Sequence, residues 1–252
     1  MSKTIVNLNE NFLNVPIAHR GCHNNQIAEN SLEAFNIAKN RKIAIEIDVY
    51  RLKDGDFAVF HDENLKRMTG EDILISSLTS DDIKNYKLWD NQKIPMLSEV
   101  LTLISGEVPL LIELKPEGNF NKNDLPVLLK IIEKYNHNDM IAFQSFNPIT
   151  IRALKKLTKN YPTGLLSSFD LKNTKGLKKY LLKSLSLFSY SKADFISYDI
   201  KYLPNKFVSK LKKKNTQILA WVVDKKEKLN KSKIYADNII FENLEILDNY
   251  GK

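Results

Sequence analysis

The sequence predicts an α/β protein that folds as a (β/α)8 barrel (TIM barrel), with residues 1–252 forming a single domain. The chain has 252 residues, close to the roughly 250 that such a barrel needs. Short apolar runs alternate with amphipathic stretches from end to end, which is typical of parallel strands and the helices that cover them. Charged residues follow several of the apolar runs, at the strand ends where barrels of this kind carry their active sites.

Eight apolar runs are expected to form the barrel strands. They cover residues 15–18, 43–47, 109–112, 140–143, 163–166, 194–197, 217–221 and 237–241. Apolar residues at three- and four-residue intervals predict outer helices at 31–39, 125–134, 148–159 and 205–214, another near 181–187 and a short one after 241. An insertion after the second strand, approximately residues 57–98, contains an extended piece at 57–60 and a helix near 81–86. Long insertions of this kind usually carry function.

Composition limits the classes of partner and location that we expect. The 38 basic and 30 acidic residues give a formal charge of +8, concentrated in lysine-rich stretches such as 212–214. Solvated helix faces explain this charge, and no nucleic-acid-binding motif accompanies it. Cys22 is the one cysteine in the sequence, so no intramolecular disulfide can form. Because no apolar run reaches about 18 residues, we expect no stable membrane insertion and a cytoplasmic location. The oligomeric state stays unknown.

Three carboxylates are expected to share one metal site. Glu46 and Asp48 lie two residues apart and face the same side of a strand, as do Glu113 and Lys115 on the next barrel strand. Carboxylates within about 5 Å of one another repel by roughly 3 kcal/mol per pair at an effective dielectric constant near 20. One divalent cation would compensate that charge, and oxygen ligands favour Mg²⁺ or Ca²⁺ over zinc.

Two histidines and two cationic side chains complete the predicted chemistry. His19 ends the first strand and His61 ends the extended piece of the insertion. Imidazoles titrate near neutrality, which suits a general acid and a general base. Arg20 offers a planar donor pair and Lys115 a point charge, and both suit phosphate oxygens. A single histidine at a strand end is more often structural, so the combination carries the prediction of phosphoryl chemistry.

Three further residues have two interpretations each. Glu29 either supports the metal site as a second-shell residue or caps the helix that starts near Ser31. Gln144 and Trp221 sit at strand ends, where they either line a substrate pocket or pack in the barrel.

Two rim residues are expected to play no direct part. His23 is interpreted as structural or facing solvent. Asp62 either orients an imidazole or begins the turn after His61, and we favour the turn.

The motifs and their order resemble those of the glycerophosphodiester phosphodiesterase family. The resemblance covers nearly the whole chain and is most specific between His19 and Lys115. The matching segments are 17–21, 29–35, 46–49, 59–62, 68–70, 94–101, 112–115, 145–146 and 221–223.

The family resemblance implies a barrel that hydrolyses glycerophosphodiesters to sn-glycerol 3-phosphate and an alcohol. It matches the two histidines to the acid/base pair, the three carboxylates to the metal ligands, and Arg20 and Lys115 to the phosphate contacts. The family usually shows Pro-Glu-Asn-Thr where this chain has residues 28–31, and Thr-Asp where it has Phe241-Glu242-Asn243. The second departure alters the rim near the substrate's alcohol group, so it bears on substrate choice.

Two other functions remain open from the sequence. One is a lysophospholipid or sphingolipid phosphodiesterase that approaches anionic membranes through its lysine-rich helices, although no apolar docking segment supports it. The other is a catalytically silent barrel that binds phosphodiesters, against which the complete set of histidines and carboxylates argues. Direct attack by water and a cyclic phosphate intermediate would use the same residues.

Overall fold

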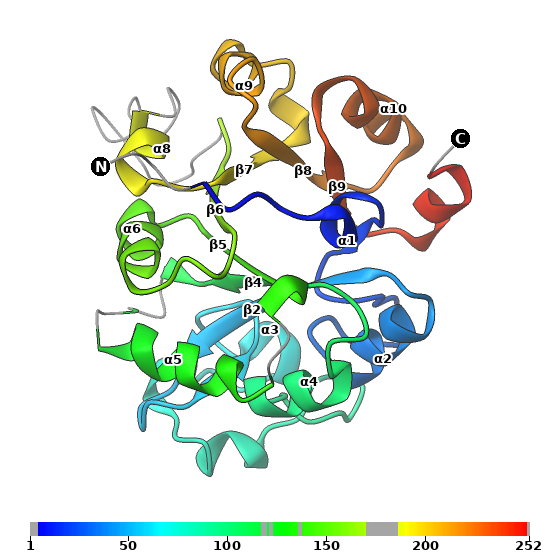
Figure 1. Ribbon diagram of the computed structural model, residues 1–252. Coiled ribbons are helices and arrows are strands. Elements are labelled where there is room, and N and C mark those ends of the chain that lie inside the picture. The colour runs from blue at the N-terminus through cyan, green and yellow to red at the C-terminus, as the bar shows by residue number, and fades with distance from the viewer. Residues whose placement is uncertain (1–4, 117–119, 121–122, 136–137, 170–185, 251–252) are drawn as a thin grey trace.

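The computed structural model describes residues 5–116, 120, 123–135, 138–169 and 186–250, and these residues form a closed barrel with helices around it (Figure 1). In the described residues, eight parallel strands make the barrel, which confirms the predicted fold class. They are β1 (Ile17–Ala18), β2 (Ala44–Arg51), β4 (Leu110–Leu114), β5 (Ile141–Ser145), β6 (Thr163–Ser167), β7 (Phe195–Asp199), β8 (Gln217–Val223) and β9 (Asn238–Phe241).

The pairing between strands closes the barrel and sets the height of each side chain within it. β1 pairs with both β2 and β9, so the first and last strands meet. Between β2 and β4, Asp48 lies opposite Glu113, and between β4 and β5, Glu113 lies opposite Gln144. The register therefore places polar residues of three neighbouring strands side by side.

Alternation along the strands separates an apolar barrel floor from a polar rim. Inward-facing Ala44, Leu111, Ala142, Phe195 and Leu219 pack together near the N-terminal ends of their strands. Two residues further along, each of these strands carries a polar group or a tryptophan at the next inward position: Glu46, Glu113, Gln144, Ser197 and Trp221. Outward-facing residues of the same strands pack against the surrounding helices.

The N-terminal segment closes the floor of the barrel. Its short helix α1 (Glu10–Leu13), which the sequence did not predict, brings Phe12 into the same apolar cluster as the floor residues. Leu8 exchanges backbone hydrogen bonds with the side chain of Gln217, the first residue of β8. Asn238, the first residue of β9, donates to the carbonyl of Val15.

The helices form an outer ring, in which those at 32–40, 124–133, 148–157 and 206–212 lie close to predicted positions, whereas no helix was predicted at 97–104 or 226–235. The longer ones are α2 (Leu32–Asn40), α4 (Leu97–Ile104), α5 (Asp124–Glu133), α6 (Pro148–Leu157), α9 (Lys206–Lys212) and α10 (Lys226–Tyr235). A shorter helix, α8 (Ser186–Ser191), follows β6, and a 3₁₀ helix, η6 (Leu244–Asn249), ends the described chain. The helix predicted near 181–187 falls mainly outside the described residues.

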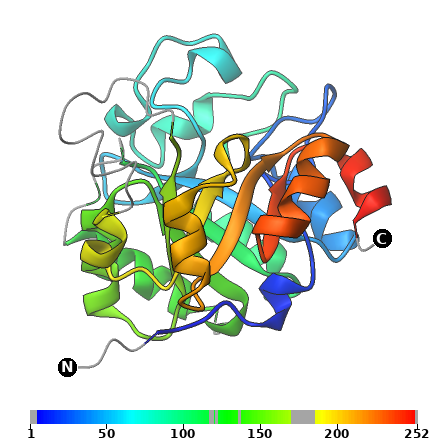
Figure 2. The same ribbon diagram turned by 90° about the horizontal axis from the view of Figure 1, so that it is seen from above.

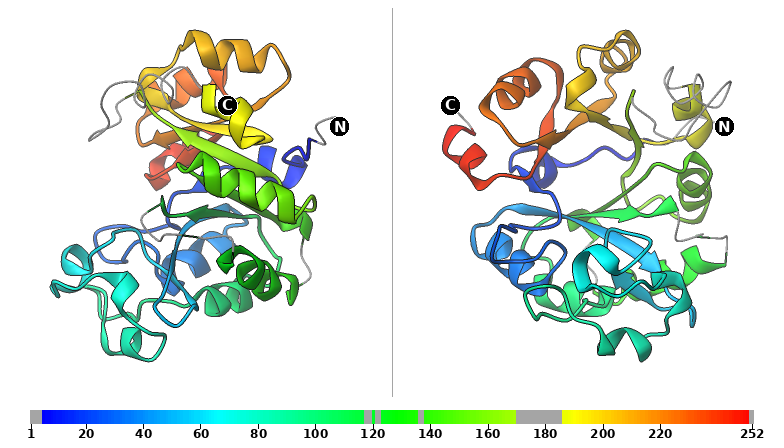
Figure 3. Two further views of the ribbon diagram at one scale, coloured as in Figure 1. Left: turned by 90° about the vertical axis from the view of Figure 1, so that its left-hand side faces the viewer. Right: turned by 180° about the vertical axis from the view of Figure 1, so that it is seen from behind.

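The insertion after β2 has a small core of its own. It begins with β3 (Phe57–Val59), which runs antiparallel to β2, and continues through α3 (Lys66–Thr69) and two 3₁₀ helices, η1 (Ile75–Ser77) and η2 (Asp82–Asn85). The helix predicted near 81–86 is thus a 3₁₀ turn. Phe60, Leu65 and Ile83 are among the buried residues of this second core. In Figures 2 and 3 the insertion, coloured cyan to teal, projects from the end of the barrel opposite the N-terminal segment.

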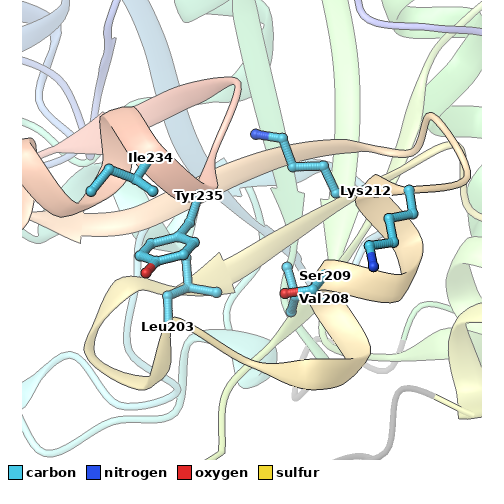
Figure 4. Close-up of a pocket in the computed structure, with 7 residues that line it drawn as sticks. Leu203, Val208, Ser209, Lys212, Ile234 and Tyr235 are labelled. Carbon is cyan, nitrogen blue, oxygen red and sulfur yellow. The ribbon is translucent and has the colours of Figure 1, made fainter.

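A surface groove lies between α9 and α10, away from the polar rim (Figure 4). Leu203, Val208 and Ile234 line it, with Lys212 at one edge. It has a volume of about 340 Å³. None of the helices in the described part of the chain combines the length and apolar character needed to span a bilayer.

Gly164 is required where β6 passes β7. It lies opposite Phe195, and a Cβ atom at this position would stand 2.2 Å from the buried phenyl ring. We expect Gly164→Ala to lower the free energy of unfolding by about 1–3 kcal/mol, measured by urea denaturation, because the ring must move within a packed core. In the Gly164→Ala background, Phe195→Leu should cost less than it costs in the wild type. Equal costs would contradict the proposed clash.

Candidate active site

Three buried carboxylates form the centre of the site. Glu46 and Asp48 are each 1% exposed and Glu113 is 6% exposed. One oxygen from each lies within 4.8 Å of the others, as the spacing along β2 and β4 predicts. Carboxylate oxygens gathered in this way are the donors that a hard divalent cation prefers.

Two cations partly neutralise these carboxylates. Lys115 Nζ lies 3.0 Å from Glu113 Oε1 and 3.3 Å from Asp48 Oδ1. Arg20 Nε lies 3.2 Å from Asp48 Oδ2. Burial acts to raise the pKa of Asp48, but the charges of Lys115 and Arg20 outweigh it and lower that pKa.

The charge of the cluster is still not balanced. Burial, together with the charges of Asp48 and Glu113, raises the pKa of Glu46 well above its ordinary value. Burial and Asp48 likewise raise the pKa of Glu113, against the effect of Lys115. Glu113 Oε1 is buried, with the ammonium group of Lys115 beside it. A bound cation would fit this donor set, since it would favour the ionised form of both carboxyl groups.

The turn after β1 is shaped to hold Arg20 against the carboxylates. Arg20 adopts a left-handed backbone conformation with φ of 56°, which is uncommon for a residue other than glycine. Its N–H donates to Glu46 Oε2 at 3.1 Å. Asn30, which the sequence analysis did not single out, donates to Asp48 Oδ2 at 2.9 Å and accepts from the Asp48 N–H. Asn30 stands next to Glu29 in the segment at 28–31 that resembles the family, and this position could have indicated a role in the site.

Glu29 acts through Arg20 and does not cap a helix. Ser31 is the N-cap of α2, where its hydroxyl accepts from the N–H of Ala34, so the capping interpretation of Glu29 is wrong. The Glu29 carboxylate accepts from Arg20 Nη1 at 2.8 Å and from the guanidinium of Arg67. Glu29 therefore supports the arginine that contacts the carboxylate cluster.

Asp62 orients the imidazole of His61. Its Oδ1 lies 2.7 Å from His61 Nδ1, which supports that interpretation, and residues 61–63 also form the bend that the favoured interpretation expects. The other carboxylate oxygen accepts from Arg67 Nε. Arg67 lies in the insertion and joins Asp62 to Glu29. No motif pointed to it, because this contact depends on how the insertion folds back over the rim.

His19 and His23 both face Glu242. His19 Nδ1 lies 3.6 Å and His23 Nε2 lies 3.8 Å from Glu242 Oε1. Side-chain exposure is 15% for His19 and 16% for His23, so of the two interpretations of His23 the structural one fits and the solvent-facing one does not. Burial lowers the pKa of His19 although Glu242 opposes this, and the contact with His19 lowers the pKa of Glu242 to about 2.

Gln144 and Trp221 lie at inward positions of β5 and β8. Gln144 Oε1 accepts from Ser197 Oγ at 2.7 Å, and its Nε2 lies 3.4 Å from Glu46 Oε1. The Trp221 ring packs edge-on against Phe146, with 5.7 Å between the ring centroids. Its indole N–H is buried and has no hydrogen-bond partner among the described residues, so it can donate to a ligand.

The polar end of the barrel thus combines three kinds of group at one place. The carboxylates offer oxygen ligands, Arg20 and Lys115 offer positive charge, and the two imidazoles offer proton transfer. The charges of His61 and His19 both act on Asp48, which puts the imidazoles within electrostatic range of the cluster. This combination suits the hydrolysis of a phosphoric ester.

Comparisons with solved structures agree with the fold. A phosphodiesterase of Oleispira antarctica, solved with the product sn-glycerol-3-phosphate, superposes with a TM-score of 0.78 at 22% identity over 93% of this chain and 95% of the other. A glycerophosphodiester phosphodiesterase of Thermotoga maritima gives a TM-score of 0.72 at 25% identity over 93% of this chain and 97% of the other.

Sequence comparisons identify the family. A glycerophosphodiester phosphodiesterase of Caldanaerobacter subterraneus subsp. tengcongensis is 31% identical over 92% of this chain and 96% of its own length. A human lysophospholipase D is 29% identical over 61% of this chain and 52% of its own. Residues 19–245 match the family model of the glycerophosphoryl diester phosphodiesterases. The chain therefore belongs to the glycerophosphoryl diester phosphodiesterase family and is a phosphodiesterase hydrolase.

Proposed function

We propose that the chain hydrolyses glycerophosphodiesters to sn-glycerol 3-phosphate and an alcohol, with one divalent cation and two histidines. The observation that carries this proposal is the buried cluster of Glu46, Asp48 and Glu113 beside two cations and two imidazoles. The relative from Caldanaerobacter, which is similar over nearly the whole chain, carries the name of this activity. We treat residues 1–252 as a single catalytic domain, and a cytoplasmic location stays a prediction.

Glu46, Asp48 and Glu113 would hold the cation, and their all-oxygen donor set favours Mg²⁺ or Ca²⁺. When bound, the cation supplies Lewis-acid stabilisation of the charge that builds on the phosphoryl oxygens. Asn30 steadies Asp48 through two hydrogen bonds, and Gln144 approaches Glu46. These neighbours would keep the ligand oxygens facing one point.

His19 and His61 would divide the proton transfers between them. One imidazole takes the proton from the attacking water or glycerol hydroxyl, and the other gives a proton to the departing alkoxide. Asp62 fixes the ring of His61 through Nδ1, so Nε2 is left for the reaction. The two rings come from β1 and from the strand after β2, so they approach the cluster from different segments of the rim.

Arg20 and Lys115 would bind the phosphoryl oxygens. Both side chains are already held by carboxylates, Arg20 by Glu29 and Asp48, and Lys115 by Asp48 and Glu113. Such fixed cations need little reorganisation when negative charge develops. The unpartnered indole N–H of Trp221 is a further donor available to the substrate.

A second candidate is hydrolysis of lysophospholipids. The human relative named lysophospholipase D favours it, although this chain covers about half of that protein. Turnover of a water-soluble diester such as glycerophosphocholine without lipid vesicles, together with no turnover of lysophospholipid, would exclude this candidate.

Removing one carboxylate charge should stabilise the protein when no cation is present. The pKa of Glu46 is raised in the folded state. Its contribution to stability is therefore lost as the pH rises from the pKa of this carboxyl group in the unfolded chain through its pKa in the folded protein. In excess chelator at about pH 7, Glu46→Gln should raise the melting temperature by at least about 2 °C, the shift expected for roughly 1 kcal/mol in a chain of this size.

The gain should shrink as the pH falls toward the ordinary glutamate pKa, and added Mg²⁺ or Ca²⁺ should stabilise the wild type more than the variant. The exposed Glu63→Gln is the control. A lower melting temperature for Glu46→Gln in chelator would argue against crowding of charge at the cluster.

Loss of either imidazole should remove most of the activity. His19→Ala and His61→Ala should each lower kcat by roughly 10²- to 10⁴-fold, the contribution expected of a proton-transfer group. Release of glycerol 3-phosphate from glycerophosphocholine measures this effect. Wild-type turnover in either variant would show that its imidazole transfers no proton.

Chelation should abolish turnover, and Mg²⁺ or Ca²⁺ should restore it. The physical reason is that uncompensated carboxylates repel an anionic substrate. A panel of diesters with different alcohols, assayed with each metal, gives the measurement. Full activity in excess chelator would refute the metal requirement, whereas restored activity on none of the glycerophosphodiesters would refute the substrate class.

A further inference from the structure

The Nδ1 atom of His19 is buried and faces the carboxylate of Glu242. His19 Nδ1 is buried and makes no hydrogen bond with the described residues, and Glu242 Oε1 lies 3.6 Å from it. In a free enzyme, contacts within a catalytic group are often longer than in the complex. A small rotation of either side chain would bring the pair within hydrogen-bonding distance.

The barrel itself makes these two residues neighbours. Ala18 of β1 lies opposite Phe241 of β9, and the next residues along the two strands are His19 and Glu242. The His19 N–H donates to the carbonyl of Phe241 at 2.8 Å, and the Glu242 N–H donates to the carbonyl of Val223 at 3.2 Å. Both backbones are therefore fixed at the point where the first and last strands close the barrel.

The second imidazole of the site shows the same arrangement. His61 meets Asp62 through Nδ1, at 2.7 Å. An ionised carboxylate only accepts hydrogen bonds, so a carboxylate at Nδ1 favours the neutral ring with its proton on that nitrogen. Nε2 then carries the free lone pair. His23 Nε2 lies 3.8 Å from the same oxygen of Glu242, so two imidazole rings face one carboxylate.

We infer that Glu242 is a positioning residue for His19. The carboxylate of Glu242 keeps the proton of the His19 ring on Nδ1, so Nε2 is directed to the reacting centre. This inference rests on the proposed function, because that proposal gives His19 its role in proton transfer. Glu242 stands where the family pattern has Thr-Asp, a departure first interpreted as bearing on the substrate's alcohol. Its carboxylate lies 3.6 Å from the His19 ring, so the inference assigns it an effect on the rate of proton transfer.

Kinetics of matched variants test the inference. Glu242→Gln keeps the shape of the side chain but replaces the charged acceptor with a neutral amide, so kcat for glycerophosphocholine should fall by roughly 10- to 100-fold with KM changed less than about twofold. Glu242→Asp keeps the acceptor and should recover part of the lost kcat. Glu227→Gln, an exposed glutamate on α10, should leave both constants unchanged.

The tautomer of His19 gives a readout that does not depend on turnover. The chain has four histidines, so ¹⁵N spectra of labelled protein can be assigned by single substitutions. At about pH 8, above the ordinary imidazole pKa, the His19 ring should carry its proton on Nδ1 in the wild type and in Glu242→Asp. In Glu242→Gln the Nε2–H form should gain population.

Three results would overturn the inference: an Nε2–H ring in the wild type, an unchanged tautomer in Glu242→Gln, or wild-type kcat in that variant. Failure of the proposed function looks different. If His19→Ala retains full turnover while the tautomer responds to Glu242→Gln, the role of His19 in catalysis is wrong and the contact with Glu242 stands.

Discussion

Crowding of negative charge at the rim of the barrel is the constraint on which the rest of the site depends. Three buried carboxylates face one point, and burial together with their mutual repulsion raises the pKa of Glu46 and Glu113. Arg20 and Lys115 supply the nearest positive charge. Arg20 in turn forms an ion pair with Glu29, and Glu29 forms an ion pair with Arg67. The rim is therefore a chain of alternating charges, in which each group is held by a neighbour of opposite sign.

The period of two along each strand allows this charge to exist inside a stable barrel. On β4, Leu111 faces the barrel floor with other apolar residues, and Glu113, the next inward residue, faces the rim. The N-terminal segment seals the floor from below through Leu8 and Phe12. Apolar burial and charged chemistry thus occupy different heights of one interior. A charged group one step lower would be surrounded by hydrocarbon and would lose its partners.

The sequence predicted the strands and the face that carries the carboxylates because both depend on local periodicity. Apolar runs placed all eight barrel strands, and the two-residue spacing of Glu46 and Asp48 fixed their common side. Helix α1 has four residues, too few to show a helical period. Arg67 and Glu242 were missed for another reason. Arg67 meets Glu29 from 38 residues away and Glu242 meets His19 from 223 residues away, so only the folding of the insertion and the closure of the barrel bring these pairs together.

The insertion contributes residues to the proposed active site. Phe60 is buried in the insertion's own apolar core, and alternation along the chain turns the next residue, His61, toward the site. The same insertion provides Asp62, which holds the His61 ring, and Arg67, which ties Asp62 to Glu29. The two imidazoles therefore depend on different parts of the fold. His19 is held where the barrel closes, and His61 is held by the small core of the insertion. Loosening that core would therefore misplace one imidazole while the carboxylate cluster stays intact.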